Sequence, residues 1–231
     1  MTFPGTKLSR ISYPPPVPTG FVDPGGKTPV EKALRTQQAV AELYSRWRAA
    51  HPSGIDPDVL KNNAGAFSVS DAALALQPAL DAVKAYSDAA SKKVSDLIDG
   101  QKVGDDVASQ IAAQRFWDRS RRTLDSIKDG SKAVAAAQNL VANASGDQIP
   151  VLVEELSDYL AQRNLPAGWL PDALSQKIPG LSDAQADATL KARQHAVLAQ
   201  NHHALTNAIE KDLAAPPLLD PSQVSAEPYG G

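Results

Sequence analysis

Apolar residues recur every three or four positions over most of this chain, which is the period of an α-helix that buries one face. The longest such pattern predicts one helix that is capped by Ser70 and ends with Asp99, before Gly100. Pro78 lies inside this pattern and either kinks the helix or marks its true first turn. The residues expected to pack along another long helix are Leu76, Leu80, Val83, Ser87, Ala90, Val94 and Leu97.

Further helices follow from the same period, and no segment has the alternation typical of a strand. Capping boxes at 28–31 and 182–185 begin the first and the last of these helices. Proline-containing pairs interrupt residues 164–180, where at most one short helix fits. The predicted helices are 29–50, 57–63, 105–128, 131–144, 150–163 and 182–213. This pattern predicts an all-α fold, an elongated antiparallel helical bundle with extended proline-rich N- and C-terminal arms.

Composition predicts that the cores of this bundle are thin. Hydrophobic residues make up 42% of the chain, but many are alanine and only 5% are aromatic. Alanine forms helix well and buries little area, so partners would have to add contacts for full stability. The residues expected on the inner faces of the later helices are Val107, Ile111, Leu124 and Ile127, then Leu152, Leu156, Tyr159 and Leu160, then Ala186, Leu190, Val197, Leu205, Ile209 and Leu213.

Most of the chain's 18 prolines lie near its two ends. They divide it into an N-terminal arm (1–27), a helical body (28–213, with a sub-boundary at 145–148 or 164–181) and a C-terminal tail (214–231). Proline fixes φ and removes a backbone donor, so such arms stay extended, in solvent or in grooves of a partner. The residues expected to contact a partner from the arms are Tyr13, Pro14, Pro15, Pro16 and Tyr229.

The candidate site within the body is the run from Gln114 to Arg122. Arg115, Arg119 and Arg122 share one helix face, and Phe116 and Trp117 interleave with them. That mixture occurs on phosphate-binding and base-stacking surfaces, where Arg121 would add a fourth charge. The more ordinary interpretation places both aromatics inward and pairs the arginines with Asp118, Asp125 or carboxylates of another helix. A third interpretation has the arginines bind carboxylates of a protein partner.

Charge and motif content argue against most other chemistry. The formal net charge is −3, so the charge of the chain as a whole does not attract nucleic acid. There are no cysteines, which excludes disulfides, thiol catalysis and cysteine-ligated zinc. His195 and His202 lie too far apart along one helix to bind a single metal, and His203 completes no motif. The carboxylate pairs at 105–106 and 154–155 are expected in first helical turns, where they complement the helix dipole. We therefore expect no metal, no cofactor and no enzymatic activity.

The remaining expectation is a non-enzymatic structural or assembly protein of a large oligomeric particle. A bacteriophage virion, in its head or head–tail connector, is the leading example, with arms that lace onto neighbouring subunits of the same or another kind. Nucleic-acid binding or packaging through the arginines is the first alternative, and an amphipathic coat on a lipid surface or granule is the second. We expect no membrane span, since no 18-residue apolar run exists, and no secretory signal at 1–7. The expected location is the cytoplasm on synthesis, followed by incorporation into a virion.

Overall fold

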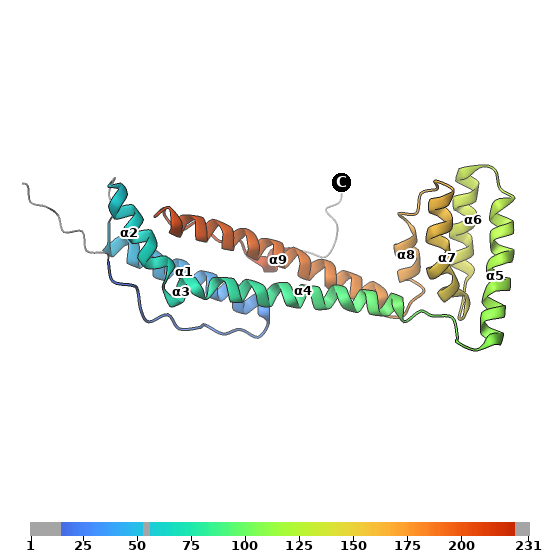
Figure 1. Cartoon of the computed structure of the whole chain (residues 1–231), viewed down its shortest axis with the longest axis horizontal. Helices are drawn as coiled ribbons and strands as arrows, with labels where there is room; N and C mark the ends of the chain where they lie inside the picture. Colours follow the sequence, from blue (N-terminus) through green and yellow to red (C-terminus); the bar gives the residue numbers. More distant parts are fainter. Residues whose placement is uncertain (1–14, 53–55, 225–231) are drawn as a thin grey trace, which may run out of the picture. The chain divides into compact units, whose positions relative to one another are not determined.

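The computed structural model describes residues 15–52 and 56–224. Every regular element in these residues is a helix, so the predicted all-α class is confirmed (Figure 1). The bounds are α1 (Pro29–Ala50), α2 (Pro57–Ser68), α3 (Asp71–Leu74), α4 (Leu76–Asp99), α5 (Val107–Asp125), α6 (Gly130–Asn143), α7 (Gln148–Gln162), α8 (Leu170–Ser175), α9 (Leu181–Glu210) and a 3-10 turn η1 (Pro221–Gln223).

The chain forms two compact units. The first comprises residues 1–87 and 190–231, and the second comprises residues 88–189. The division passes through the middle of α4 and through α9 near its beginning, so no break in the helical pattern marks it. The segments considered as sub-boundaries, 145–148 and 164–181, both lie inside the second unit.

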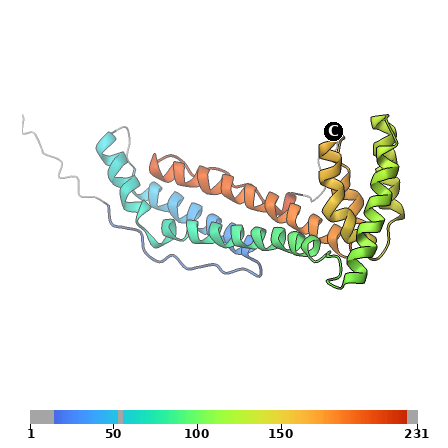
Figure 2. The same ribbon diagram turned by 45° about the vertical axis from the view of Figure 1, so that its right-hand side comes forward.

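The first unit is built on α1, the beginning of α4 and the end of α9. Val40 of α1 belongs to one buried cluster with Leu76 and Leu205, and Ala33 belongs to another with Val83 and Leu198. Residue numbers therefore rise together along α1 and α9 and fall along α4. Helix α4 runs antiparallel to both α1 and α9, which are parallel to each other (Figure 2).

Buried side chains of α1 fix the register of this unit through hydrogen bonds to backbone carbonyls. The Gln37 Nε2 atom donates to the Leu198 carbonyl at 2.8 Å. The Tyr44 hydroxyl lies 2.9 Å from the Ala208 oxygen and 2.8 Å from the Leu213 oxygen. Both side chains are fully buried, where a polar group without a partner is costly. A shift of α1 along α9 would break these bonds, so this register is specified.

The C-terminal end of α9 is closed by a backbone turn that supports this contact. Asp212 has a φ of 47°, in the left-handed region, and the amide of Leu213 donates to the Ala208 carbonyl at 2.8 Å. This is the hydrogen bond of a Schellman motif, which ends a helix and reverses the chain. The helix stops at Glu210 rather than at the expected Leu213, whose side chain is exposed.

The described part of the N-terminal arm packs on the helices of its own unit. Residues 15–28 run back along α1, with the Trp47 Nε1 atom 3.4 Å from the Pro16 oxygen and an ion pair of 2.6 Å between Asp23 and Lys32. Phe21 packs against the cluster that contains Val40.

The described part of the C-terminal tail does the same along α9. The Asn201 side chain receives a hydrogen bond from the Leu219 amide at 2.9 Å and donates one to its carbonyl at 2.8 Å, and Pro221 is buried. The described arm residues, 15–27 and 214–224, thus contact helices of their own chain, while Val17 and Val22 remain exposed. Binding of the arms to a partner stays a prediction. Thin alanine-rich helices leave shallow surfaces that an extended segment of the same chain covers. Tyr13, Pro14 and Tyr229 lie outside the described residues.

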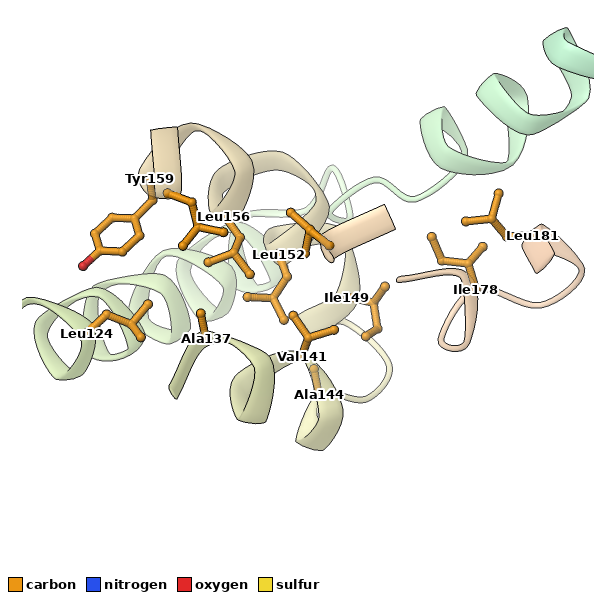
Figure 3. Packing of buried hydrophobic residues seen from close by; sticks show 12 residues of the cluster. Leu124, Ala137, Val141, Ala144, Ile149, Leu152, Leu156, Tyr159, Ile178 and Leu181 are labelled. Atoms are coloured by element: carbon orange, nitrogen blue, oxygen red, sulfur yellow. The ribbon is translucent and has the colours of Figure 1, made fainter. Parts of the chain in front are cut away.

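The core of the second unit lies among α5, α6, α7 and α8 (Figure 3). The residues predicted to be buried on α7, Leu152, Leu156, Tyr159 and Leu160, are all buried there. Arg163, just after α7, donates from Nη1 to the Leu124 carbonyl at 2.8 Å and from Nη2 to the Ile127 carbonyl at 2.9 Å. One guanidinium thus donates hydrogen bonds to two carbonyls at the C-terminal end of α5, where no backbone amide of a further helical turn is present to do so.

Several boundaries differ from the sequence prediction because burial outweighs local signals. Helix α2 continues through Gly65 to Ser68, since Phe67 is fully buried with its ring centroid 4.9 Å from that of Tyr44. The helix expected over 70–99 is two helices that break at Ala75, and Ser70 caps the shorter first one. Pro78 lies in the first turn of α4, where its missing amide costs nothing.

The predicted N-terminal caps of the first and the last helix compare differently with the structure. The Thr28 cap is confirmed, since Thr28 Oγ1 accepts from the Glu31 amide at 3.1 Å. The Ser182 capping box is wrong, because α9 has already begun at Leu181. Ala186, expected to face inward on α9, is exposed, as are Val107 and Ile111 on α5.

The substitution Tyr44→Phe tests the register contact. It removes the hydroxyl and leaves buried carbonyls with one partner fewer, so we expect the free energy of unfolding to fall by about 1–3 kcal/mol. Urea denaturation followed by circular dichroism measures this change. Tyr86→Phe is the matched control, because Lys191 Nζ lies 4.0 Å above the Tyr86 ring and the ring is retained. Equal losses in the two variants would contradict the assignment.

Candidate interaction surface on helix α5

The inner side of α5 carries its aromatic residues into the second unit. Trp117 packs edge-on against Tyr159, with ring centroids 5.7 Å apart, and Phe116 packs against the same core. Ser120 and Leu124 of the same side are buried. Both aromatics are half-buried, and Phe116 also lines a depression of about 380 Å³ together with Arg119. The interpretation that places the aromatics inward is therefore supported in part, by the packing of Trp117 and Phe116 on the core.

The outer side of α5 carries an exposed row of apolar and basic residues along the whole helix. Val107 is 71% exposed and Ile111 is 43% exposed, although both were expected in the core. Arg115, Arg119 and Arg122 continue the row and are exposed. Spacings of three and four residues place all five on one side of a helix, away from Leu124. We call these five residues the outer stripe.

The arginines of the outer stripe make local contacts to the backbone of α5. Arg119 Nε donates to the Arg115 carbonyl and Arg122 Nε donates to the Asp118 carbonyl, each at 3.1 Å. Within the described residues, none of the three stripe arginines forms an ion pair. Among the arginines of α5 that the structure describes, Arg121 is the one that does, with its Nε atom 3.7 Å from an Asp125 carboxylate oxygen. The stripe arginines and Asp118 line an open depression of about 450 Å³. Their guanidinium groups remain available to an anionic partner.

A larger groove lies on the other side of α5, within the second unit. It has a volume of about 760 Å³ and is bounded by the end of α4, the segment that follows it, α5 and α7. Val103, Val153 and Trp117 provide apolar wall. Its charged residues are Asp99, Asp105, Glu154, Glu155 and Lys102. Because carboxylates outnumber the single lysine, we call it the acidic groove.

The carboxylate pairs have structural positions rather than acid–base geometry. Asp106 caps α5 by accepting from the Ser109 amide at 2.9 Å, and hydrogen bonds from Ser109 lower the pKa of its carboxyl group. Asp105 precedes the helix. Glu154 and Glu155 lie in the second turn of α7, not in the first as expected, and both are exposed.

The most buried carboxylate of the first unit holds helices together. The side chain of Asp212 is fully buried, with Oδ1 3.4 Å from Arg48 Nε and Oδ2 3.5 Å from Asn63 Nδ2. Tyr44 lies 3.4 Å from the same Oδ1, and burial together with this charge raises the tyrosine pKa far above its ordinary value. A carboxylate surrounded by donors and a tyrosine kept protonated stabilise the end of α9 and offer no general base.

The histidines of α9 do not gather into a metal site. His195 and His202 are half-buried and His203 is exposed. Within residues 15–52 and 56–224, no three potential metal-ligating side chains cluster. Over the same residues, no helix combines the length and hydropathy that crossing a membrane requires.

No family model, curated protein or solved structure matches this chain.

Burial of His202 makes the stability of the first unit depend on pH. Desolvation lowers the pKa of His202 below its ordinary value of 6.5, which outweighs the opposite effect of Asp81. The unfolded chain therefore binds this proton more tightly, and stability falls as the pH drops below about 6.5. We expect His202→Gln to flatten this decline in urea denaturation between about pH 5 and pH 7.5. His195→Gln, which replaces another half-buried histidine of α9, is the control, and an unchanged pH dependence in His202→Gln would contradict the prediction.

Proposed function

We propose that this chain is a non-enzymatic structural protein that assembles into a large oligomeric particle, such as the head or head–tail connector of a bacteriophage virion. The observation that supports this proposal is the outer stripe of α5. Val107 and Ile111 are exposed in continuation of three arginines that have no carboxylate partner within the described residues. Exposed apolar residues next to arginine are typical of protein interfaces.

Nucleic-acid binding is the second candidate, and one specific observation favours it. Arg115, Arg119 and Arg122 line one depression and could contact phosphates. Two features favour a protein partner instead. Trp117 packs edge-on against Tyr159 and Phe116 is half-buried against the core, so less aromatic surface is left for stacking on bases. The stripe also begins with valine and isoleucine, which phosphates do not cover. A lipid or granule coat would need a wider bulky apolar face than these two residues provide.

A role of the arms in assembly is part of this proposal. Pro15, Pro16 and the rest of 15–27 lie along the chain's own helices, as do residues 214–224. Lacing by the terminal segments 1–14 and 225–231, which include Tyr13, Pro14 and Tyr229, stays a prediction outside the described residues.

Sedimentation of the full chain over a range of concentrations tests the proposed assembly. We expect self-association that Val107→Ser combined with Ile111→Ser weakens by roughly tenfold or more, because apolar contact area is lost. Val69→Ser combined with Leu74→Ser is the matched control, since these residues are 59% and 61% exposed on the first unit.

Two results would contradict the proposal. One is a chain that stays monomeric at every concentration. The other is tight binding to duplex DNA that weakens steeply with salt and disappears when Arg115, Arg119 and Arg122 are replaced by alanine. That second result would establish the nucleic-acid candidate instead.

A further inference from the structure

We infer that the acidic groove of one copy binds the outer stripe of α5 from a second copy. This inference rests on the proposed assembly function and identifies the partner as the chain itself. It accounts for two surfaces of the second unit that are uncovered by the described residues and complementary to each other.

The charges of the two surfaces are opposite. The groove carries Asp99, Asp105, Glu154 and Glu155 against the single Lys102. The stripe carries three arginines, with Asp118 the one carboxylate in their depression. Arginine binds carboxylate through two parallel hydrogen bonds, which gives such a contact orientation as well as attraction.

The apolar parts of the two surfaces also correspond. Val103, Val153 and Trp117 of the groove are each half-buried, so part of each side chain remains uncovered. Val107 and Ile111 of the stripe expose apolar area that such walls can cover. The contact would join apolar residues at one end of the stripe and charged residues along the rest of it, and protein interfaces commonly combine both kinds of contact.

The positions of the two surfaces on α5 determine the kind of assembly. Ala113 and Trp117 line the groove, and at 100° per residue they lie on the side of α5 opposite Arg115, Arg119 and Arg122. Gln110 and Gln114, which also line the groove, lie nearer to Val107 at the start of the stripe. One copy can therefore present its stripe to a second copy while its groove receives a third. Such a head-to-tail contact is heterologous and produces a ring or a filament rather than a closed two-fold dimer.

A bound cation is a poorer explanation of the acidic groove. Its carboxylates are spread over the end of α4, the segment before α5 and one side of α7. Among the residues that the structure places, no three acidic or histidine side chains come close enough to hold a metal ion. Dispersed carboxylates suit several separate guanidinium groups better than one ion.

Charge reversal on each surface, followed by mixing, tests the pairing. The stripe variant carries Arg115→Glu, Arg119→Glu and Arg122→Glu, and the groove variant carries Glu154→Lys and Glu155→Lys. All five side chains are exposed, so folding should be retained, which circular dichroism checks. We expect each variant alone to self-associate roughly tenfold or more weakly than the wild type in sedimentation velocity, because like charges then face each other. An equimolar mixture should recover association, since the reversed stripe fits the reversed groove.

The control variant carries Arg46→Glu, Lys61→Glu and Lys93→Glu, which are exposed positions outside both surfaces with the same total charge change as the stripe variant. It should associate like the wild type. Loss in both variants without recovery on mixing would overturn the pairing. Unchanged association in both charge variants would also overturn the pairing. If the Val107→Ser/Ile111→Ser variant nevertheless associates more weakly than the wild type, the proposed assembly function remains supported. A monomeric wild type would overturn both.

Discussion

The register between helices is the constraint on which the first unit depends. Apolar contacts, whether from alanine or from bulky residues such as Phe67 and Leu205, are not directional and do little to fix how far one helix slides along another. In the first unit, directional bonds from buried polar side chains supply that missing information. Gln37 and Tyr44 bind carbonyls of the α9 segment, and Asn201 of α9 holds the returning tail at Leu219. The bonds of Gln37 and Tyr44 join residues 161 to 169 positions apart, and those of Asn201 join residues 18 positions apart, so together they specify one arrangement.

In the second unit, one face of α5 is left uncovered by the described residues. Its core lies on one side of α5, where Leu124 is buried and Trp117 meets Tyr159. The Arg163 guanidinium joins the end of α5 to the end of α7 through backbone carbonyls. These contacts use a narrow strip of α5. Val107 and Ile111 remain exposed on the opposite side.

Much of the fold could be predicted because helical periodicity is a local signal. It located the helices and the Thr28 cap, together with the buried face of α7. The division into two units was not predictable from breaks in the pattern, because it passes through two continuous helices. The packing of the arms on their own chain depends on hydrogen bonds between separate segments, such as the bond between Asn201 and Leu219. No local sequence motif predicts such a bond.

The sequence predicted one part of the candidate site, the arginine face, and missed the rest. The spacing of Arg115, Arg119 and Arg122 correctly placed them on one face. The same periodicity misplaced Val107 and Ile111, because a helix shows identical spacing whether its apolar stripe meets a core or a partner. The sequence did not reveal the acidic groove, because Asp99 ends α4 and Glu154 lies in α7, with two other helices between them in the chain. These residues come to line one groove only after folding.

Hydroxyl-radical footprinting of the full chain at low and high concentration tests the central claim most directly, because it reports the exposure of individual side chains. The account predicts that Val107 and Ile111 are oxidised readily in the dilute chain and become protected as concentration rises. Leu74 should stay reactive and the buried Leu156 should stay protected throughout. Protection of Val107 and Ile111 already in the dilute chain, or equal oxidation at every concentration, would contradict it.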